Sequence, residues 1–194
     1  KNKIDMRIIS GSKRGHKLLA PRKNIARPMT DKNRETIFNI LLHSKELSEF
    51  GFKLKDSIIL DLFAGTGAFA FEAISRGAKK AILVENDQYM TDLIYKNIAK
   101  LKFNSEVDVI SKDATTLSET DIENQIDLVF LDPPYQKKLE FKSIKNILRK
   151  KILSKNKIIL VEQHINESSF TYDELDLLRT KELGITRFSF YKVK

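Results

Sequence analysis

Cysteine is absent from the sequence of 194 residues, and histidine is scarce. Without cysteine the chain can form neither a disulfide framework nor a thiolate metal site, and it cannot use a cysteine nucleophile. This composition fits a reducing compartment, and we expect a cytoplasmic protein. His16, His43 and His164 are too scattered along the sequence to suggest a metal cluster, so we expect no metal ion.

Long apolar runs are absent as well. No run approaches the roughly 18 apolar residues of a membrane-spanning helix, and the first residues lack the apolar core of a signal peptide. We therefore expect no membrane partner. The chain length and a hydrophobic fraction of 41% are sufficient for one ordinary domain with its own core, and we expect a monomer.

Acidic residues are scarce at the N-terminal end of the chain. The first 30 residues contain nine Lys or Arg against one acidic residue, Asp5, whereas the remainder has 26 basic and 25 acidic residues. Almost the whole net charge of +9 therefore lies on one arm. Clustered positive charge favours a polyanionic partner, because contacts with phosphates release counterions. The alternative is a solvated basic tail.

The arm also has the pattern of a β-hairpin. Met6–Ser10 and His16–Ala20 are short apolar stretches on either side of the turn Gly11–Gly15. We therefore predict that residues 1–29 form a basic arm that binds the polyanion, and that residues 30–194 form the main domain. The basic side chains expected to make the contacts are Lys13, Arg14, Lys17 and Arg22.

The rest of the chain alternates between apolar strands and amphipathic helices. Continuously apolar strands separated by helices are typical of a parallel sheet covered on both faces. We predict an α/β, doubly wound, mainly parallel, seven-stranded Rossmann-like sheet with one antiparallel edge strand, because the last two strands flank Gly184 as a hairpin. The expected strands are Ser57–Phe63, Lys80–Glu85, Val107–Ile110, Ile126–Leu131, Lys157–Glu162, Arg179–Leu183 and Ile185–Val193. The expected helices are Thr30–His43, Thr66–Arg76, Asp87–Leu101 and Leu139–Ile152.

A glycine-containing loop, DLFAGTGAFA, joins the first of these strands to its helix over Asp61–Ala70. Gly65 and Gly67 allow the backbone to approach a ligand closely, and the helix N-terminus adds positive polarity. Glu85 ends the next strand, where its carboxylate can bind two ribose hydroxyls. Since both elements lie at the carboxyl ends of parallel strands, we expect a ribose-bearing cofactor there; the alternative is a tight turn without a ligand.

The cofactor could be a dinucleotide or S-adenosylmethionine. Ala70 stands where the dinucleotide motif has its third glycine, a substitution that some dinucleotide folds tolerate. Asp61 favours S-adenosylmethionine, because its carboxylate would repel a pyrophosphate and attract a cationic amino-acid group. Asp113, after the third strand, is predicted to accept a hydrogen bond from the adenine amine or, alternatively, to cap a helix. Further cofactor candidates beside these positions are Phe63, Asn86 and Ala114.

A second motif, LDPPYQ, ends the strand Ile126–Leu131. Two consecutive prolines remove two backbone donors and fix both φ angles, so the Pro133 carbonyl is free of strand pairing. The Asp132 carboxylate and this carbonyl can accept the two hydrogens of an exocyclic base amine, and Tyr135 offers a stacking surface. Asp132, Pro133, Pro134 and Tyr135 are therefore the catalytic candidates, unless the motif is only a strand-stopping turn.

Three stretches of the chain together resemble the RsmD family of class I S-adenosylmethionine-dependent methyltransferases. They are MRIISGSKRGHKLLAP with RPMTDKNRETIFNIL, then DLFAGTGAFAFEAISRGA, and LDPPY, and together they span nearly the whole chain. The sequence departs from the family pattern at RPMT, where RPT is usual, and at the bulky Phe69 and Phe71.

This resemblance implies methyl transfer from S-adenosylmethionine to the exocyclic 2-amino group of a guanine in small-subunit (16S) ribosomal RNA. It implies that the basic arm contacts this RNA or the assembling small subunit, with Arg34 as a further RNA contact that borders the active site; an exposed helix-face arginine is the alternative for Arg34. The alternative functions are an adenine-amine methyltransferase of DNA or RNA, a protein-glutamine methyltransferase, an NAD-dependent oxidoreductase and a non-catalytic RNA-binding protein.

Overall fold

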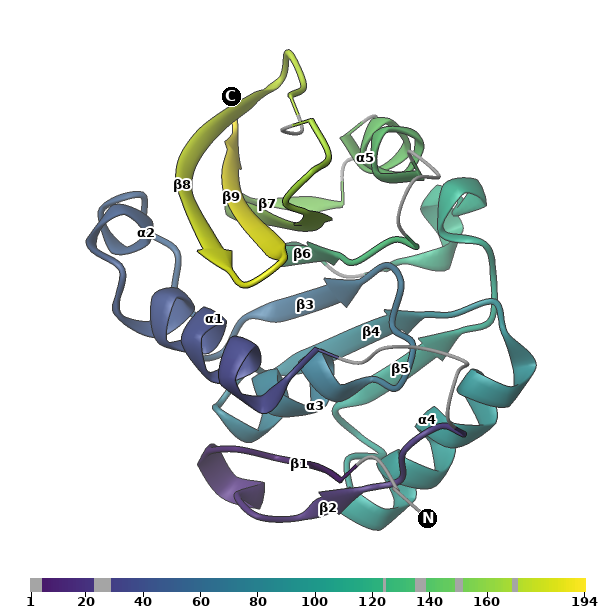
Figure 1. Ribbon diagram of the computed structural model, residues 1–194. Coiled ribbons are helices and arrows are strands. Elements are labelled where there is room, and N and C mark those ends of the chain that lie inside the picture. The colour runs from purple at the N-terminus through teal and green to yellow at the C-terminus, as the bar shows by residue number, and fades with distance from the viewer. Residues whose placement is uncertain (1–4, 23–28, 124, 135–138, 149–151, 169–170) are drawn as a thin grey trace.

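The apolar strands of the sequence assemble into one central sheet in a computed structural model that describes residues 5–22, 29–123, 125–134, 139–148, 152–168 and 171–194. The sheet has seven strands in the order β5-β4-β3-β6-β7-β9-β8 (Figure 1). Their bounds are β3 Ile58–Asp61, β4 Lys80–Val84, β5 Val107–Ile110, β6 Ile126–Leu131, β7 Leu153–His164, β8 Leu175–Leu183 and β9 Thr186–Val193.

The predicted sheet type is confirmed. Strands β5, β4, β3, β6 and β7 pair in parallel, and β9 pairs antiparallel with β7 and β8. The antiparallel strand of this edge is thus β9, with β8 outermost. Strand β7 is longer than the predicted Lys157–Glu162, because the antiparallel pairing of β9 supports it as far as His164.

Helices cover both faces of the sheet, as expected for a doubly wound fold. Helices α1 (Asp31–His43), α3 (Ala68–Ser75) and α4 (Gln88–Leu101) bury apolar side chains in one core, on one face. Helix α5 (Leu139–Leu148) packs with the 3₁₀ turn η2 (Ala114–Thr116) in a second core on the other face. A short helix, α2 (Lys45–Glu49), was not predicted. No helix of the described chain is long and apolar enough to cross a membrane.

The predicted N-terminal hairpin is present but short. Strand β1 (Met6–Arg7) pairs antiparallel with β2 (Lys17–Leu18), and the 3₁₀ turn η1 (Gly11–Lys13) forms its tip. Ile8 is fully buried, and Met6 and Leu18 join the same core as α1, α3 and α4. Figure 1 shows the hairpin lying against the helical layer. The described part of the arm is therefore docked on the domain and is not a solvated tail.

Candidate active site

A cavity of about 440 Å³ lies at the carboxyl ends of β3, β4, β6 and β7. Its lining includes the glycine loop, the end of β4 and the two prolines that follow β6. Among the described residues, five of those that line the cavity are acidic and none is basic; the acidic ones are Asp61, Glu85, Asp87, Asp132 and Glu162. The cavity is therefore suited to a cationic ligand, and it would repel an anionic one.

The glycine loop forms one wall of the cavity. Gly65 and Gly67 have positive φ angles of 54° and 77°, a conformation that favours glycine. A Cβ on Gly67 would approach the Phe71 ring to 2.7 Å, whereas a Cβ on Gly65 would meet nothing within 4 Å. Gly67 therefore serves close packing at the start of α3, which begins two residues later than predicted, while Gly65 leaves open space toward a ligand.

Glu85 connects the loop to the start of α4. Its Oε2 accepts a hydrogen bond from the Gly65 N–H (2.8 Å), and its Oε1 accepts one from the Asp87 N–H (2.9 Å). Asp87 in turn caps α4 by accepting from the Met90 N–H. Each Glu85 oxygen can still accept a second hydrogen bond, so the carboxylate is held in position with capacity left for ribose hydroxyls.

Three carboxyl groups of the cavity are buried without a compensating cation. Burial raises the pKa of Asp61, and the charges of Asp132 and Glu85 raise it further. Burial also raises the pKa of Asp132 to about 7. The pKa of Glu162 is raised by burial and by the charge of Asp132. Asp61 Oδ1 and Glu162 Oε2 are buried with no hydrogen-bond partner among the described residues. Unsatisfied charge of this kind is costly unless a ligand compensates it.

The Asp-Pro-Pro motif lies at the mouth of the same cavity. Strand pairing ends at Leu131, opposite Val161 of β7, so Pro133 follows the last paired residue. Asp132, Pro133 and Pro134 all line the cavity. Tyr135 lies outside the described residues. Two stacked rings, Phe69 and Phe130, with centroids 3.9 Å apart, form an apolar part of the lining.

The other predicted cofactor residues separate into two groups. Phe63 and Asn86 line the cavity. Asp113 does not; it is exposed and caps η2 by accepting hydrogen bonds from the N–H and the hydroxyl of Thr115. The alternative interpretation of Asp113 as a helix cap is therefore confirmed. Ala114 is buried in the core on the α5 side of the sheet. Ala114 is only 3% exposed, so its side chain contributes to the packing of this core.

The basic residues of the arm lie in two places. Arg22 lies against the first turn of α4: its N–H donates to the Tyr89 hydroxyl (3.1 Å), and Tyr89 precedes the cavity residue Met90 in the chain. Lys13 and Arg14 lie at the hairpin tip, where the Lys13 N–H donates to Ser75 Oγ at the far end of α3. The fourth residue, Lys17, is exposed and lies 3.5 Å from Asp5.

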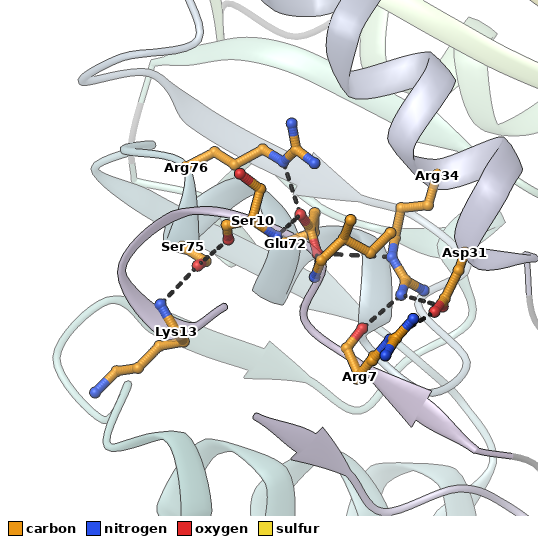
Figure 2. Close-up of polar contacts among 9 residues, drawn as sticks. Arg7, Ser10, Lys13, Asp31, Arg34, Glu72, Ser75 and Arg76 are labelled. Carbon is orange, nitrogen blue, oxygen red and sulfur yellow. Dashed lines mark hydrogen bonds and ion pairs between the residues drawn. The ribbon is translucent and has the colours of Figure 1, made fainter. Parts of the chain in front are cut away.

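Arg34 has a different role from the predicted RNA contact. Its side chain is only 1% exposed and donates to the Arg7 carbonyl (2.6 Å) and to Asp31 Oδ1 (2.9 Å). Its Nε lies 3.7 Å from Oε2 of Glu72 in α3 (Figure 2). The alternative of an exposed arginine is also wrong, because the guanidinium is enclosed between the hairpin, α1 and α3. Arg34 therefore supports the fold and cannot reach a phosphate.

Glu72 is the centre of this cluster and was not singled out in the sequence. It is fully buried and accepts hydrogen bonds from the N–H groups of Ile9 (2.8 Å) and Ser10 (3.0 Å), and from Arg76 Nε (2.7 Å). Figure 2 shows these contacts converging on its carboxylate from the hairpin and from α3. Glu72 thus attaches the basic hairpin to the helix that begins at the cofactor loop.

Comparison with known proteins gives one consistent result. Residues 6–192 match the model of a family described as Conserved hypothetical protein 95. Ribosomal RNA small subunit methyltransferase D of Haemophilus influenzae is 34% identical over 98% of this chain and 95% of its own length. The Escherichia coli protein of that name is 33% identical over 96% of this chain and 89% of its own.

Solved structures agree with the sequence relatives. A putative methyltransferase from Escherichia coli superposes with a TM-score of 0.79 and 30% identity, covering 98% of both chains. A putative methylase from Haemophilus influenzae superposes with a TM-score of 0.74 and 33% identity, covering 96% of this chain and 97% of its own.

Among the described residues, no group of three or more His, Asp or Glu could hold a metal ion.

Proposed function

Since this chain belongs to the RsmD family of S-adenosylmethionine-dependent methyltransferases, we propose that it methylates the exocyclic 2-amino group of a guanine in small-subunit (16S) ribosomal RNA. The two relatives at 34% and 33% identity are named as small-subunit ribosomal RNA methyltransferases, and both align over nearly the whole chain. The observation that carries the proposal is the acidic cavity beside the Asp-Pro-Pro motif.

The cavity fits S-adenosylmethionine and disfavours a dinucleotide. Asp61 Oδ1, which is buried and has no partner among the described residues, suits the ammonium group of the amino-acid moiety. Glu85 suits the ribose hydroxyls. When bound, the cofactor supplies an electrophilic methyl group on a sulfonium. A pyrophosphate would instead face five acidic lining residues, with no basic one among the described residues of the lining, which argues against an NAD-dependent oxidoreductase.

Asp132 and Pro133 are proposed to act on the target amine. In its ionised form, the Asp132 carboxylate accepts one amine hydrogen, and the Pro133 carbonyl accepts the other. With the cofactor bound, these contacts would orient the amine nitrogen toward the methyl group and would stabilise the positive charge that develops on the nitrogen. The N–C bond would form as the methyl–sulfonium bond breaks, and the Asp132 carboxylate would take the proton that the methylated amine loses. Tyr135, outside the described residues, remains proposed as the stacking surface, a contact worth about 1–3 kcal/mol for a typical base. No protein nucleophile is required.

The RNA is proposed to reach the site through the arm of residues 1–29. A guanine displays its 2-amino group in the minor groove, so the base must be unpaired or flipped out to enter the cavity. Arg22, whose N–H donates to Tyr89 in the first turn of α4, suits the phosphates nearest the target base, while Lys13, Arg14 and Lys17 suit phosphates farther away. Because the proposed substrate is ribosomal, we also propose that the protein acts in the cytoplasm and as a monomer.

Two measurements test this function. Mass spectrometry of 16S ribosomal RNA from cells lacking the gene should show one unmethylated guanine, and purified protein with S-adenosylmethionine should restore 2-methylguanine at that nucleotide. Methylation of an adenine or of a protein glutamine instead would contradict the guanine assignment. Calorimetry should show tight binding of S-adenosylmethionine and none of NAD; binding of NAD alone would contradict the cofactor assignment.

A further inference from the structure

Glu162 is a buried carboxylate that the proposed methyl transfer leaves without a role. It lies near the end of β7, is 6% exposed and lines the cavity. Its Oε2 has no hydrogen-bond partner among the described residues, and no basic residue lines the cavity around it. An unpaired buried carboxylate is retained at a cost to stability, so a ligand that donates hydrogen bonds is the natural explanation.

The position of Glu162 relative to Asp132 indicates which ligand this is. Strand β6 pairs with β7 at Leu131 and Val161; Asp132 is the first residue after β6, and Glu162 is the next residue within β7. The two carboxyl groups are close enough for the charge of Asp132 to raise the pKa of Glu162. The cavity therefore presents two neighbouring acceptors on one side, with the Pro133 carbonyl after Asp132 in the chain.

Guanine matches such a row of acceptors. Its Watson–Crick edge carries the N1–H donor next to the 2-amino group, whereas adenine has an unprotonated N1 that a carboxylate would repel. We infer that Glu162 accepts the N1–H of the target guanine while Asp132 and Pro133 hold its 2-amino group, so that Glu162 selects guanine as the base. This inference rests on the proposed function.

The charges of the cavity are consistent with this pairing. In the free protein, Asp132 and Glu162 disfavour each other's ionisation. A cationic cofactor and a base with N1–H and amine donors both stabilise the ionised carboxylates. Both acceptors are thus available in the complex that reacts. A purely structural Glu162 would need a donor within the protein, as Glu72 has, and its Oε2 has none among the described residues.

The test compares guanine with 2-aminopurine at the target nucleotide. 2-Aminopurine keeps the 2-amino group but has no N1–H. Small subunits are reconstituted with 16S RNA ligated to carry either base at the nucleotide identified by mass spectrometry. For wild type, Glu162→Gln and Glu162→Ala, kcat/KM is measured on both substrates and S-adenosylmethionine affinity by calorimetry. Glu140→Gln serves as matched control, because Glu140 is also buried but does not line the cavity.

Wild type and Glu140→Gln should prefer guanine by about 10- to 100-fold, the range for one hydrogen bond to a charged group. Glu162→Ala should lose most of that preference through slower reaction with guanine, and Glu162→Gln should lose part of it, because its amide oxygen can still accept the N1–H without the charge; cofactor affinity should stay near normal in both. An equal loss on both bases would overturn the inference, as would a weakened cofactor affinity with the preference intact. If wild type methylates neither base, the proposed function fails, and the inference fails with it.

Discussion

Two regions of this molecule bury carboxylates, and they differ in whether the protein supplies hydrogen-bond partners for them. Glu72 accepts two backbone N–H groups and an arginine Nε, and a second arginine lies 3.7 Å away. Asp61 and Glu162 each have a buried oxygen with no partner among the described residues, and no basic residue lines their cavity. The same chemical group is thus satisfied at one place and unsatisfied at the other.

This difference separates a structural site from a functional one. A buried charge with its own hydrogen bonds stabilises the fold in which it sits, and removing it leaves its partners unpaired. A buried charge without partners reduces stability in the free protein and is compensated when a ligand arrives. The Glu72 cluster therefore holds the basic hairpin on α3, while the cavity suits the cationic cofactor and the hydrogen-bond-donating base that we propose for it.

The largest expected effect is on stability at Glu72. Glu72→Ala removes the acceptor of three groups and one ion-pair partner of Arg34, whose buried charge then keeps only Asp31 as counterion among the described residues. We expect a loss of about 3–5 kcal/mol in the free energy of unfolding, as for other broken buried ion pairs. Urea unfolding followed by circular dichroism measures this loss.

Asp132→Asn is the control for that comparison, because it neutralises a carboxylate of the cavity. The variant should unfold with the same free energy as the cofactor-free wild type or with a higher one, because the Asp132 charge that it removes is uncompensated in the wild type. If Asp132→Asn destabilises as strongly as Glu72→Ala, the distinction between the two regions fails.

Catalysis should show the reverse order of sensitivity. Asp132→Ala removes the acceptor that directs the target amine, and we expect kcat to fall by about 100- to 1,000-fold. Affinity for S-adenosylmethionine should change little, because Asp61 and Glu85 remain. Transfer of a radiolabelled methyl group to small subunits measures kcat, and calorimetry measures affinity. Near-normal turnover would remove Asp132 from the mechanism.

The pH dependence of stability should originate in the cavity. The raised pKa values of Asp61, Asp132 and Glu162 mean that the folded protein binds more protons than the unfolded chain. Their contribution to the free energy of unfolding is fully present below about pH 4, where these carboxyls titrate in the unfolded chain. This contribution is lost as pH rises through their pKa values in the folded protein, about 7 for Asp132. Stability of the cofactor-free protein should therefore fall between about pH 5 and about pH 8.

Urea unfolding at several pH values measures this fall. Asp132→Asn should remove the part centred near the pKa of Asp132, and saturating S-adenosylmethionine should reduce the fall. A wild-type stability that rises with pH over this range would show that the cavity carboxyls are compensated within the protein.

The smallest expected effect concerns the exposed basic residues. Replacing Lys13, Arg14 and Lys17 by glutamine should weaken RNA binding and reduce the slope of log affinity against log salt by about 0.7 for each phosphate that the variant no longer neutralises. Filter binding at several salt concentrations measures the slope. A triple variant with the wild-type slope would show that the hairpin tip does not touch RNA. Lys53, Lys55 and Lys155, which line a separate pocket, provide a matched control.

The sequence predicted the sheet and most of the cavity, because both depend on local patterns. Apolar strands separated by helices require a covered parallel sheet, and such a sheet brings the residues after β3, β4 and β6 to one edge. Asp61, Gly65, Glu85 and Asp132 could therefore be assigned to one site before their contacts were known. Asp113 was ambiguous for the same reason, because capping and cofactor binding use the same residue type at a strand end.

Burial and partnership of charged side chains depended on the tertiary structure. Glu72, Glu162 and Arg34 look alike in sequence, as charged residues within or beside regular elements. Glu72 has a structural role because the hairpin places the N–H groups of Ile9 and Ser10 against its carboxylate. Arg34 has a structural role because α1 places its guanidinium beside the same carboxylate. Glu162 faces the cavity because β7 pairs beside β6 in this register.

The sequence by itself thus determined the order of elements, the glycine loop and the Asp-Pro-Pro motif, because each of these depends on residues close together along the chain. Only the tertiary structure decided which buried charges have partners, since these partners are 38 residues apart for Arg34 and Glu72 and come from different elements. The energy of a buried charge depends on its neighbours in space, and sequence patterns describe only neighbours along the chain.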